Sequence, residues 1–173
     1  NTLPQRVKEI VTMGGAFGDP AGNITPHAEF NIFCDPHAAK IVYDHFPRIR
    51  VLPLDVTHKT MQDQAFRDWL RLQGARGSNL AIMLDGYAAT YPGLQGQGVS
   101  PLHDFHTIAL LTDASLYTLE TGHVAVTETG EREGQTTLGA DPAGGVQVAV
   151  GVDEIRFFAL LKAMLGRFTG DFG

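Results

Sequence analysis

Three polar side chains in the stretch 13–35 have the chemistry needed to bind a sugar. This stretch reads MGGAFGDPAGNITPHAEFNIFCD, and Asn23, Glu29 and Asn31 are interleaved there with large apolar residues. An amide both donates and accepts hydrogen bonds and a carboxylate accepts them strongly, so the set can hold several hydroxyl groups. A simpler interpretation is a glycine-rich turn followed by a helix that Asn31 and Asp35 cap. Spacing alone favours the simpler interpretation.

A histidine–aspartate pair is the second candidate for chemistry. His103 and Asp104 follow Pro101 and open an apolar run whose spacing predicts a helix over 102–111. The N-terminus of a helix favours a negative charge such as that of Asp104. Histidine is the side chain whose ordinary pKa lies nearest neutrality, which suits His103 to proton transfer. The alternatives are that His103 only caps its helix or fills a polar niche, and that Glu29 is a solvated residue of a first helical turn.

Local patterns place the sugar-binding candidates beside the edge of a sheet. Residues 7–13 read as a short buried strand that ends in glycines. Residues that follow such a strand lie at its carboxyl end, the edge at which open α/β sheets bind ligands. A second strand is predicted over 49–56, interrupted or at a sheet edge because of Pro53. Asp55 and Thr57 lie at its end, where a functional side chain is expected, although Thr57 is equally suited to cap the next helix.

The remaining patterns alternate between helices and strands. Asp35 caps a helix that starts at Pro36 and ends before Pro47, and Asp153 caps the last helix. The other predicted elements are helices over 60–72 and 79–91, a turn over 74–77, and β-rich runs over 117–127, 135–138 and 145–152. We therefore predict one domain over 1–173 of the α/β class, with a mainly parallel sheet flanked by helices and a small antiparallel β-rich tail.

The composition indicates an acidic globular protein. The chain has 173 residues, of which 43% are hydrophobic and 18% are charged, and its formal net charge is -6. This charge disfavours nucleic acid and anionic membranes as partners, and no apolar run in the sequence is long enough to cross a bilayer. The single cysteine, Cys34, excludes an internal disulfide and cysteine-rich metal sites. It is compatible with the cytoplasmic location that we expect.

Three segments resemble the nucleoside hydrolases of the inosine-uridine preferring family. They are MGGAFGDPAGNITPHAEFNIFCDPHAAK at 13–40, PLHDFHTIALL at 101–111 and the closing run over 123–168, in the order found in that family. The resemblance implies a Rossmann-like fold and the hydrolysis of ribonucleosides to free base and ribose, with calcium as cofactor. It also implies a homo-oligomer, either a dimer or a tetramer.

The resemblance assigns the first group of residues to the ribose. Asn23, Glu29 and Asn31 match positions that hold the 5′ hydroxyl and the neighbouring ring hydroxyls. Phe30 matches a side chain that packs on the ribose, and Met13 matches the residue beside the attacking water.

The same resemblance assigns the histidine–aspartate pair to the metal and to the base. Asp104 matches an aspartate that binds the catalytic calcium and a ribose hydroxyl, and His103 matches the histidine that protonates the leaving base in some members. Tyr91 sits where the family often carries a tyrosine near the base. The glycine-rich loop 91–101 is interpreted either as a flap that closes over substrate or as an ordinary surface loop.

The sequence departs from the family's pattern in two places. Phe105, followed by His106, replaces the proline that usually comes after the histidine–aspartate pair, which leaves the base preference open. The aspartate cluster of the DTDPGxDD kind, which supplies most calcium ligands and the general base in the family, is absent from the sequence. We therefore expect the chain to be the C-terminal portion of a nucleoside hydrolase and inactive alone. The alternative is a catalytically dead module that binds ribose or assembles with a partner.

Overall fold

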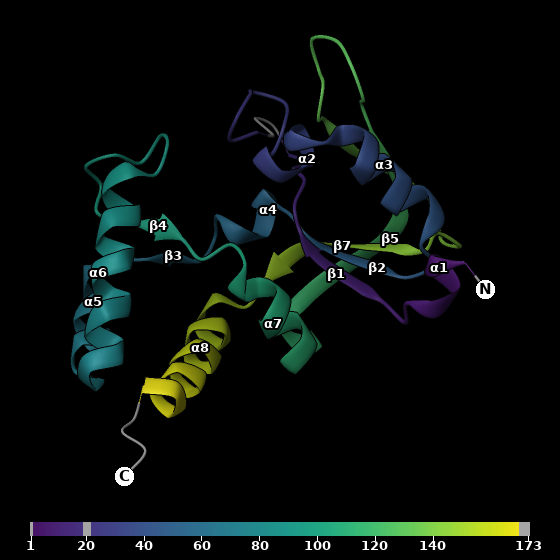
Figure 1. Cartoon of the computed structure of the whole chain (residues 1–173). Coiled ribbons are helices and arrows are strands. Elements are labelled where there is room, and N and C mark those ends of the chain that lie inside the picture. Colours follow the sequence, from purple (N-terminus) through teal and green to yellow (C-terminus); the bar gives the residue numbers. More distant parts are fainter. Residues whose placement is uncertain (1, 19–21, 170–173) are drawn as a thin grey trace. The chain divides into compact units, whose positions relative to one another are not determined.

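The computed structural model describes residues 2–18 and 22–169 (Figure 1). The chain divides into two compact units, and the single domain expected from the sequence stays a prediction. The first unit combines Asn1–Thr57 with His103–Val152, and the second combines His58–Leu102 with Asp153–Gly173. The sugar-binding candidates and the histidine–aspartate pair belong to the first unit, whereas Tyr91 belongs to the second.

The first unit is built on a five-stranded mixed sheet. Its strands lie in the order β1 (Ile10–Met13), β2 (Ile49–Leu52), β7 (Val146–Val152), β5 (Tyr117–Val126) and β6 (Thr136–Ala140). The strands β1, β2 and β7 are parallel, with Met13 opposite Leu52 and Ile49 opposite Val146. The strand β5 is antiparallel to both of its neighbours, β7 and β6.

The predicted α/β class, with parallel strands flanked by helices and an antiparallel β-rich tail, is confirmed, and the tail is part of the same sheet. Strand β7 pairs in parallel with β2, and the sheet continues from β7 through β5 to β6. Val146 and Val148 are buried in the same apolar cluster as Val51. The last strands therefore bury their apolar face by extending the main sheet, since a sheet needs a packed layer on its apolar side.

Helices lie on both sides of this sheet. The helices α2 (Phe30–Cys34) and α3 (Pro36–His45) lie on one side, and α7 (Phe105–Thr112) lies on the other (Figure 1). Tyr43 of α3 packs with Ile49 and Val124 of the strands in the main core. Two short elements, α1 (Leu3–Arg6) and the 3-10 helix η1 (Ala114–Leu116), also belong to this unit.

Both predicted aspartate caps are present. Oδ1 of Asp35 accepts a hydrogen bond from the Ala38 N–H at 2.9 Å, and Pro36 occupies the first helical position of α3, where an N–H has no helical partner. Oδ1 of Asp153 accepts from the Arg156 N–H at 3.0 Å at the start of the last helix. Cap chemistry acts within three residues, so these helix starts are visible in the sequence.

The second predicted strand is shorter than expected. Strand β2 ends at Leu52, and the short helix α4 (Leu54–Thr57) follows. Pro53 lacks the N–H that a central strand needs, so the ladder stops there. The Leu54 N–H then donates to the carbonyl oxygen of Gly15 at 3.0 Å, which ties α4 to the turn after β1.

The second unit is largely helical. It contains β3 (Met61–Gln62), α5 (Gln64–Arg71), α6 (Gly74–Thr90), β4 (Ser100–Pro101) and α8 (Glu154–Thr169), and β3 is antiparallel to β4. The helix predicted over 60–72 starts later than expected, because Asp63 caps α5 by accepting from the Phe66 N–H at 2.8 Å. The turn predicted over 74–77 instead opens α6, where Gly74 has a φ of 86°.

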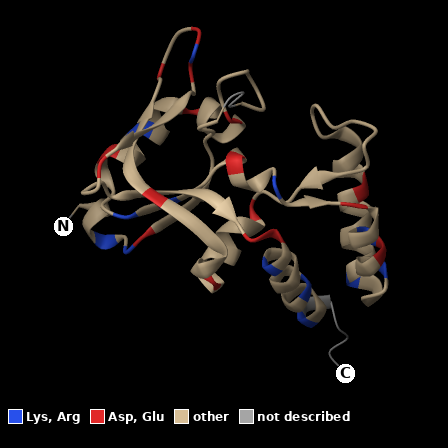
Figure 2. Cartoon of the chain, turned by 180° about the vertical axis from the view of Figure 1, so that it is seen from behind, with Lys and Arg blue, Asp and Glu red and all other residues tan. Residues whose placement is uncertain are grey.

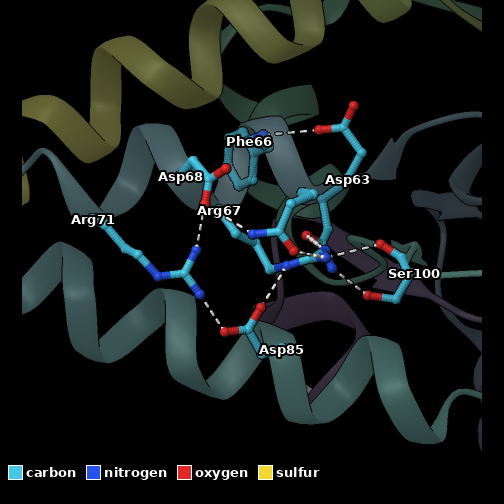
Figure 3. A network of polar contacts seen from close by, with 10 residues as sticks. Asp63, Phe66, Arg67, Asp68, Arg71, Asp85 and Ser100 are labelled. Atoms are coloured by element: carbon cyan, nitrogen blue, oxygen red, sulfur yellow. Dashed lines mark hydrogen bonds and ion pairs between the residues drawn. The ribbon is translucent and has the colours of Figure 1, made fainter.

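Arg67 of α5 lies at the centre of a buried polar network (Figure 3). It is 3% exposed, and it donates to Oε1 of Gln62 at 2.8 Å and to the carbonyl oxygen of Gly98 at 2.9 Å. Its Nε lies 2.7 Å from Oδ1 of Asp85 in α6, an ion-pair distance, although the N–H does not point at that oxygen. Gln62 in turn donates to Oγ of Ser100 at 2.6 Å. Arg67 therefore ties α5 and α6 to β3 and to the loop before β4.

Charges of both signs are interspersed in each unit (Figure 2). Asp and Glu lie among Lys and Arg along the ribbon. That nucleic acid is not a partner stays a prediction. Over residues 2–18 and 22–169, no helix is both long enough and apolar enough to span a bilayer.

Candidate active site

Glu29 is a buried carboxylate at the N-terminus of α2, with 2% of its surface exposed. Its Oε1 accepts from the Asn31 N–H at 2.9 Å and from Nδ2 of Asn31 at 3.0 Å. Its Oε2 accepts from the Gly15 N–H at 3.0 Å and from the Ile32 N–H at 3.2 Å. A carboxylate can accept about four hydrogen bonds, so these donors occupy all of its acceptor sites. The interpretation of Glu29 as a solvated residue is wrong: it caps α2 and joins that helix to the turn after β1.

Two asparagines form hydrogen bonds around the start of α2. Oδ1 of Asn23 accepts from the Phe30 N–H at 2.9 Å, at the first residue of α2. Asn31 is exposed and lies inside the first turn, so the interpretation of Asn31 as the cap is wrong. Its Nδ2 also lies 3.5 Å from Sδ of Met13, the last residue of β1. Phe30, which is 52% exposed, adjoins them, so the five predicted ribose residues gather where β1 ends and α2 begins.

The turn after β1 is held by three other parts of the first unit. Gly15 has a φ of 80°, a value that favours glycine, and its N–H donates to the α2 cap. The hydroxyl of Thr136 accepts from the Ala16 N–H at 3.0 Å and donates to the Ala16 carbonyl at 2.9 Å. The Phe17 N–H donates to Oδ2 of Asp55 at 2.9 Å. The turn is therefore fixed to α2, β6 and α4 at the same time.

His103 precedes α7 and bonds to α4. Its Nδ1 lies 2.8 Å from Oγ1 of Thr57, which is 0% exposed. Thr57 does not cap the next helix, as one interpretation expects, because Asp63 holds that position in α5. His103 does not cap α7 either, because Asp104 holds the N-cap position there. The Thr57–His103 contact is a part of the site that the sequence alone does not reveal.

Asp104 holds the N-cap position of α7, but its carboxylate caps no amide. Its backbone is already helical, with φ at -73° and ψ at -26°, and its carbonyl oxygen accepts from the N–H and the hydroxyl of Thr107 at 3.1 Å and 2.8 Å. The residue is exposed. The helix therefore uses the main chain of Asp104 and leaves its side chain at the surface.

One run of hydrogen bonds joins the two candidate groups within the first unit. It passes from Asn31 to the cap carboxylate, from that carboxylate to Gly15, and from Gly15 to Leu54 of α4. At the other end of α4, Thr57 bonds to His103. The ribose candidates and His103 are thus both fixed to the residues that follow β1 and β2. That the two groups contact one ribose stays a prediction.

His106, one of the departures from the family's pattern, fills a buried niche in α7. It is 0% exposed, and its Nδ1 lies 2.9 Å from the hydroxyl of Tyr117. Burial, and to a smaller degree the nearby His103, lower the pKa of His106 to about 3. Burial raises the pKa of Tyr117, whose hydroxyl keeps its proton. His106 is therefore a neutral structural residue near pH 7.

Tyr91 follows α6 in the second unit and is buried, with 5% of its surface exposed. Its hydroxyl lies 2.8 Å from Nε2 of His58, and its ring packs edge-on against Tyr87 with centroids 5.4 Å apart. Positive φ values occur in the loop that follows, at Gly93, Gly96 and Gly98. The assignment of Tyr91 to the base stays a prediction, as does the flap.

Calcium requires more ligands than these residues supply. The ion takes six to eight oxygen ligands, and carboxylates are the strongest of them. In the part of the chain that the structure describes, no group of three or more His, Cys, Asp or Glu side chains is placed to hold a metal ion. Asp104 alone does not make a calcium site, so the described residues do not fit the metal by themselves.

Comparisons with known proteins point to one family. The family model described as inosine-uridine preferring nucleoside hydrolase matches residues 1–159. The non-specific ribonucleoside hydrolase RihC of Salmonella enteritidis is 35% identical over 157 residues, covering 87% of this chain and 49% of that protein. The inosine-uridine preferring nucleoside hydrolase of Crithidia fasciculata is 30% identical over 175 residues, covering 95% of this chain and 54% of that protein.

A solved structure is similar as well. The purine-preferring ribonucleoside hydrolase from Gardnerella vaginalis matches with a TM-score of 0.85 at 30% identity, covering 96% of this chain and 55% of that one. The predicted Rossmann-like fold is confirmed by this similarity. The chain spans about half the length of the curated relatives it matches.

Proposed function

Since this chain belongs to the inosine-uridine preferring nucleoside hydrolase family, we propose that the whole protein hydrolyses the N-glycosidic bond of ribonucleosides to free base and ribose. One observation carries the proposal. At the carboxyl end of β1, the buried carboxylate of Glu29 holds the exposed amide of Asn31 in place. Relatives that are named as ribonucleoside hydrolases favour an enzyme over an inactive binding or assembly module.

The ribose would bind to the residues around the start of α2. Asn31 is exposed, but the Nδ2 of its side chain donates a hydrogen bond to Oε1 of Glu29, so its amide loses little freedom when it binds a hydroxyl. Phe30 offers an exposed ring on which the apolar side of the sugar can pack. Asn23, which bonds to the Phe30 N–H, and Met13, which lies beside Asn31, complete the proposed ribose contacts.

The histidine–aspartate pair would act on the bond that breaks. Cleavage of a glycosidic bond builds positive charge on the ribose ring. The carboxylate of Asp104, which caps no amide, is available to stabilise that charge and to bind a ribose hydroxyl. His103 would give a proton to the departing base.

Base preference, metal and assembly remain part of the proposal. Relatives are named as non-specific, pyrimidine-specific and purine-preferring, so the proposed substrate is a ribonucleoside without a stated base. Calcium is proposed for the whole protein, with Asp104 as one ligand, and the steps above rest only on the chain's own side chains. A homo-oligomer in the cytoplasm, and inactivity of these 173 residues alone, are proposals supported by the family resemblance.

The test is the release of reducing sugar from inosine and from uridine by the whole protein in calcium buffer. We expect ribose to be released, and we expect Asp104→Ala to lower kcat/KM by about 100-fold or more. The matched control is Asp44→Ala, which removes an aspartate of α3 that pairs with Lys40. Nucleoside binding without ribose release would support the inactive module instead.

A further inference from the structure

We propose that Thr57 is a positioning residue that orients the ring of His103 for proton transfer to the leaving base. The inference rests on the proposed function, because it needs His103 to act on a nucleoside. It begins from one contact between residues 46 positions apart: Oγ1 of Thr57 lies 2.8 Å from Nδ1 of His103.

The hydroxyl of Thr57 is fixed in direction. Thr57 is the last residue of α4 and is 0% exposed, and its N–H donates to the carbonyl oxygen of Pro53 at 3.1 Å. A β-branched side chain has few χ1 rotamers, and burial restricts them further. The hydroxyl therefore gives His103 a rigid partner.

The helix that carries Thr57 is fixed to the ribose candidates. The Leu54 N–H donates to the Gly15 carbonyl at 3.0 Å, and Asp55 accepts from the Phe17 N–H at 2.9 Å. Gly15 and Phe17 belong to the turn whose amide bonds the α2 cap. A ring held by Thr57 is thus held relative to the proposed sugar site, which is what a proton donor to the glycosidic bond requires.

The contact also determines which ring nitrogen of His103 transfers the proton. The bond made at one imidazole nitrogen decides the role of the other. Because Thr57 engages Nδ1, the transferred proton is carried on Nε2. When the C–N bond breaks, its electron pair stays with the base and the Nε2 proton goes to that base. Water then supplies the hydroxyl of the ribose anomeric carbon, and its other proton returns to the protein.

Two substrates separate this role from a general loss of structure. Uridine needs a proton on its base, whereas 4-nitrophenyl β-D-riboside loses a stable anion and needs none. In the whole protein, we expect Thr57→Val to lower kcat for uridine by about 10-fold or more, with KM unchanged, and to alter kcat for the nitrophenyl riboside by less than about 3-fold. Thr57→Ser keeps the hydroxyl and should restore the ratio of the two rates.

Controls make each outcome decisive. Thr136→Val removes another buried hydroxyl bond of the first unit and should leave the ratio at its wild-type value. In a His103→Ala background, Thr57→Val should cause no further loss on uridine. An equal loss on both substrates, or no loss, would overturn the inference. If Thr57→Val does not fold by circular dichroism, Thr57→Ala replaces it. A wild-type protein that releases ribose from neither substrate would contradict the proposed function instead.

Discussion

Oε1 of Glu29 accepts two hydrogen bonds from Asn31, one from its backbone N–H at 2.9 Å and one from its side-chain Nδ2 at 3.0 Å. A buried residue thereby orients an exposed one. Glu29 is committed to the fold through its bonds to α2 and to the turn after β1, whereas Asn31 presents its amide at the surface. Loss of these two residues should therefore have different effects on stability and on activity.

Replacing Glu29 should destabilise the chain. Glu29→Ala leaves the amides of Gly15 and Ile32 without their acceptor, and each unsatisfied buried donor costs about 1–3 kcal/mol. We expect the free energy of unfolding to fall by about 2–4 kcal/mol in urea denaturation. Glu29→Gln keeps the side-chain volume and one acceptor oxygen, although its N–H₂ group faces donors. We therefore expect a smaller loss of stability than in Glu29→Ala. A change of less than about 0.5 kcal/mol in Glu29→Ala would contradict the role as cap.

Replacing Asn31 should affect activity rather than stability. The side chain is exposed, so Asn31→Ala should change the free energy of unfolding by less than about 1 kcal/mol. A lost hydrogen bond to the sugar should lower kcat/KM for inosine and uridine in the whole protein by about 10-fold or more. Steady-state kinetics and urea denaturation on the same preparation check both parts. Unchanged kinetics would remove Asn31 from the ribose site.

His106 should make the first unit sensitive to acid. Burial lowers its pKa to about 3 in the folded state, while the ordinary value of about 6.5 applies in the unfolded state. The unfolded state therefore binds the proton first, so stability is fully present above about pH 6.5 and falls as the pH decreases toward 3, by up to about 1.4 kcal/mol per pH unit.

Urea denaturation from about pH 7 to about pH 4 tests this dependence. His106→Gln removes the titrating ring, so its unfolding free energy should decline less steeply than that of the wild type over this range. The variant should also be less stable near neutral pH, because the Tyr117 hydroxyl loses the ring nitrogen it contacts. Parallel curves for the two proteins would contradict the lowered pKa of His106.

Two arginines of α5 offer a contrast in the second unit (Figure 3). Arg67 is 3% exposed and bonds to Gln62 and Gly98, so Arg67→Ala should lower the free energy of unfolding by about 3 kcal/mol or more. Arg71, whose side chain is 36% exposed, pairs with Asp68 and Asp85, and Arg71→Ala should cost less than about 1 kcal/mol. Thermal or urea unfolding measures the loss of stability in both variants. Equal losses would contradict the prediction that the buried arginine contributes more than the exposed one.

Local chemistry made part of the fold predictable. Asp35 and Asp153 start their helices by cap bonds to amides three residues ahead, and Pro53 ends β2 because it has no N–H. Such signals act over only a few neighbouring residues, so they can be read from the sequence. The pairing of β7 with β2 joins residues about 100 positions apart, so no local pattern could show that the last strands extend the main sheet.

The site was predictable in its residue types but not in its contacts. The family resemblance marked Glu29 and His103, yet a glutamate at a helix start is usually exposed, and only the folded chain brings the Gly15 amide to it. The partner of His103 is Thr57, a residue 46 positions away that the sequence offered equally as a cap. The contact of Thr57 with His103 therefore depends on tertiary structure.

The most direct test of the central claim is a crystal structure of the whole protein soaked with ribose and calcium. The claim is that the residues after β1 and the histidine–aspartate pair act on one sugar. We predict a single ribose with the amide of Asn31 and the carboxylate of Asp104 both within hydrogen-bond distance of its hydroxyls. A ribose bound by only one of these side chains, with the other facing a different part of the surface, would contradict the claim.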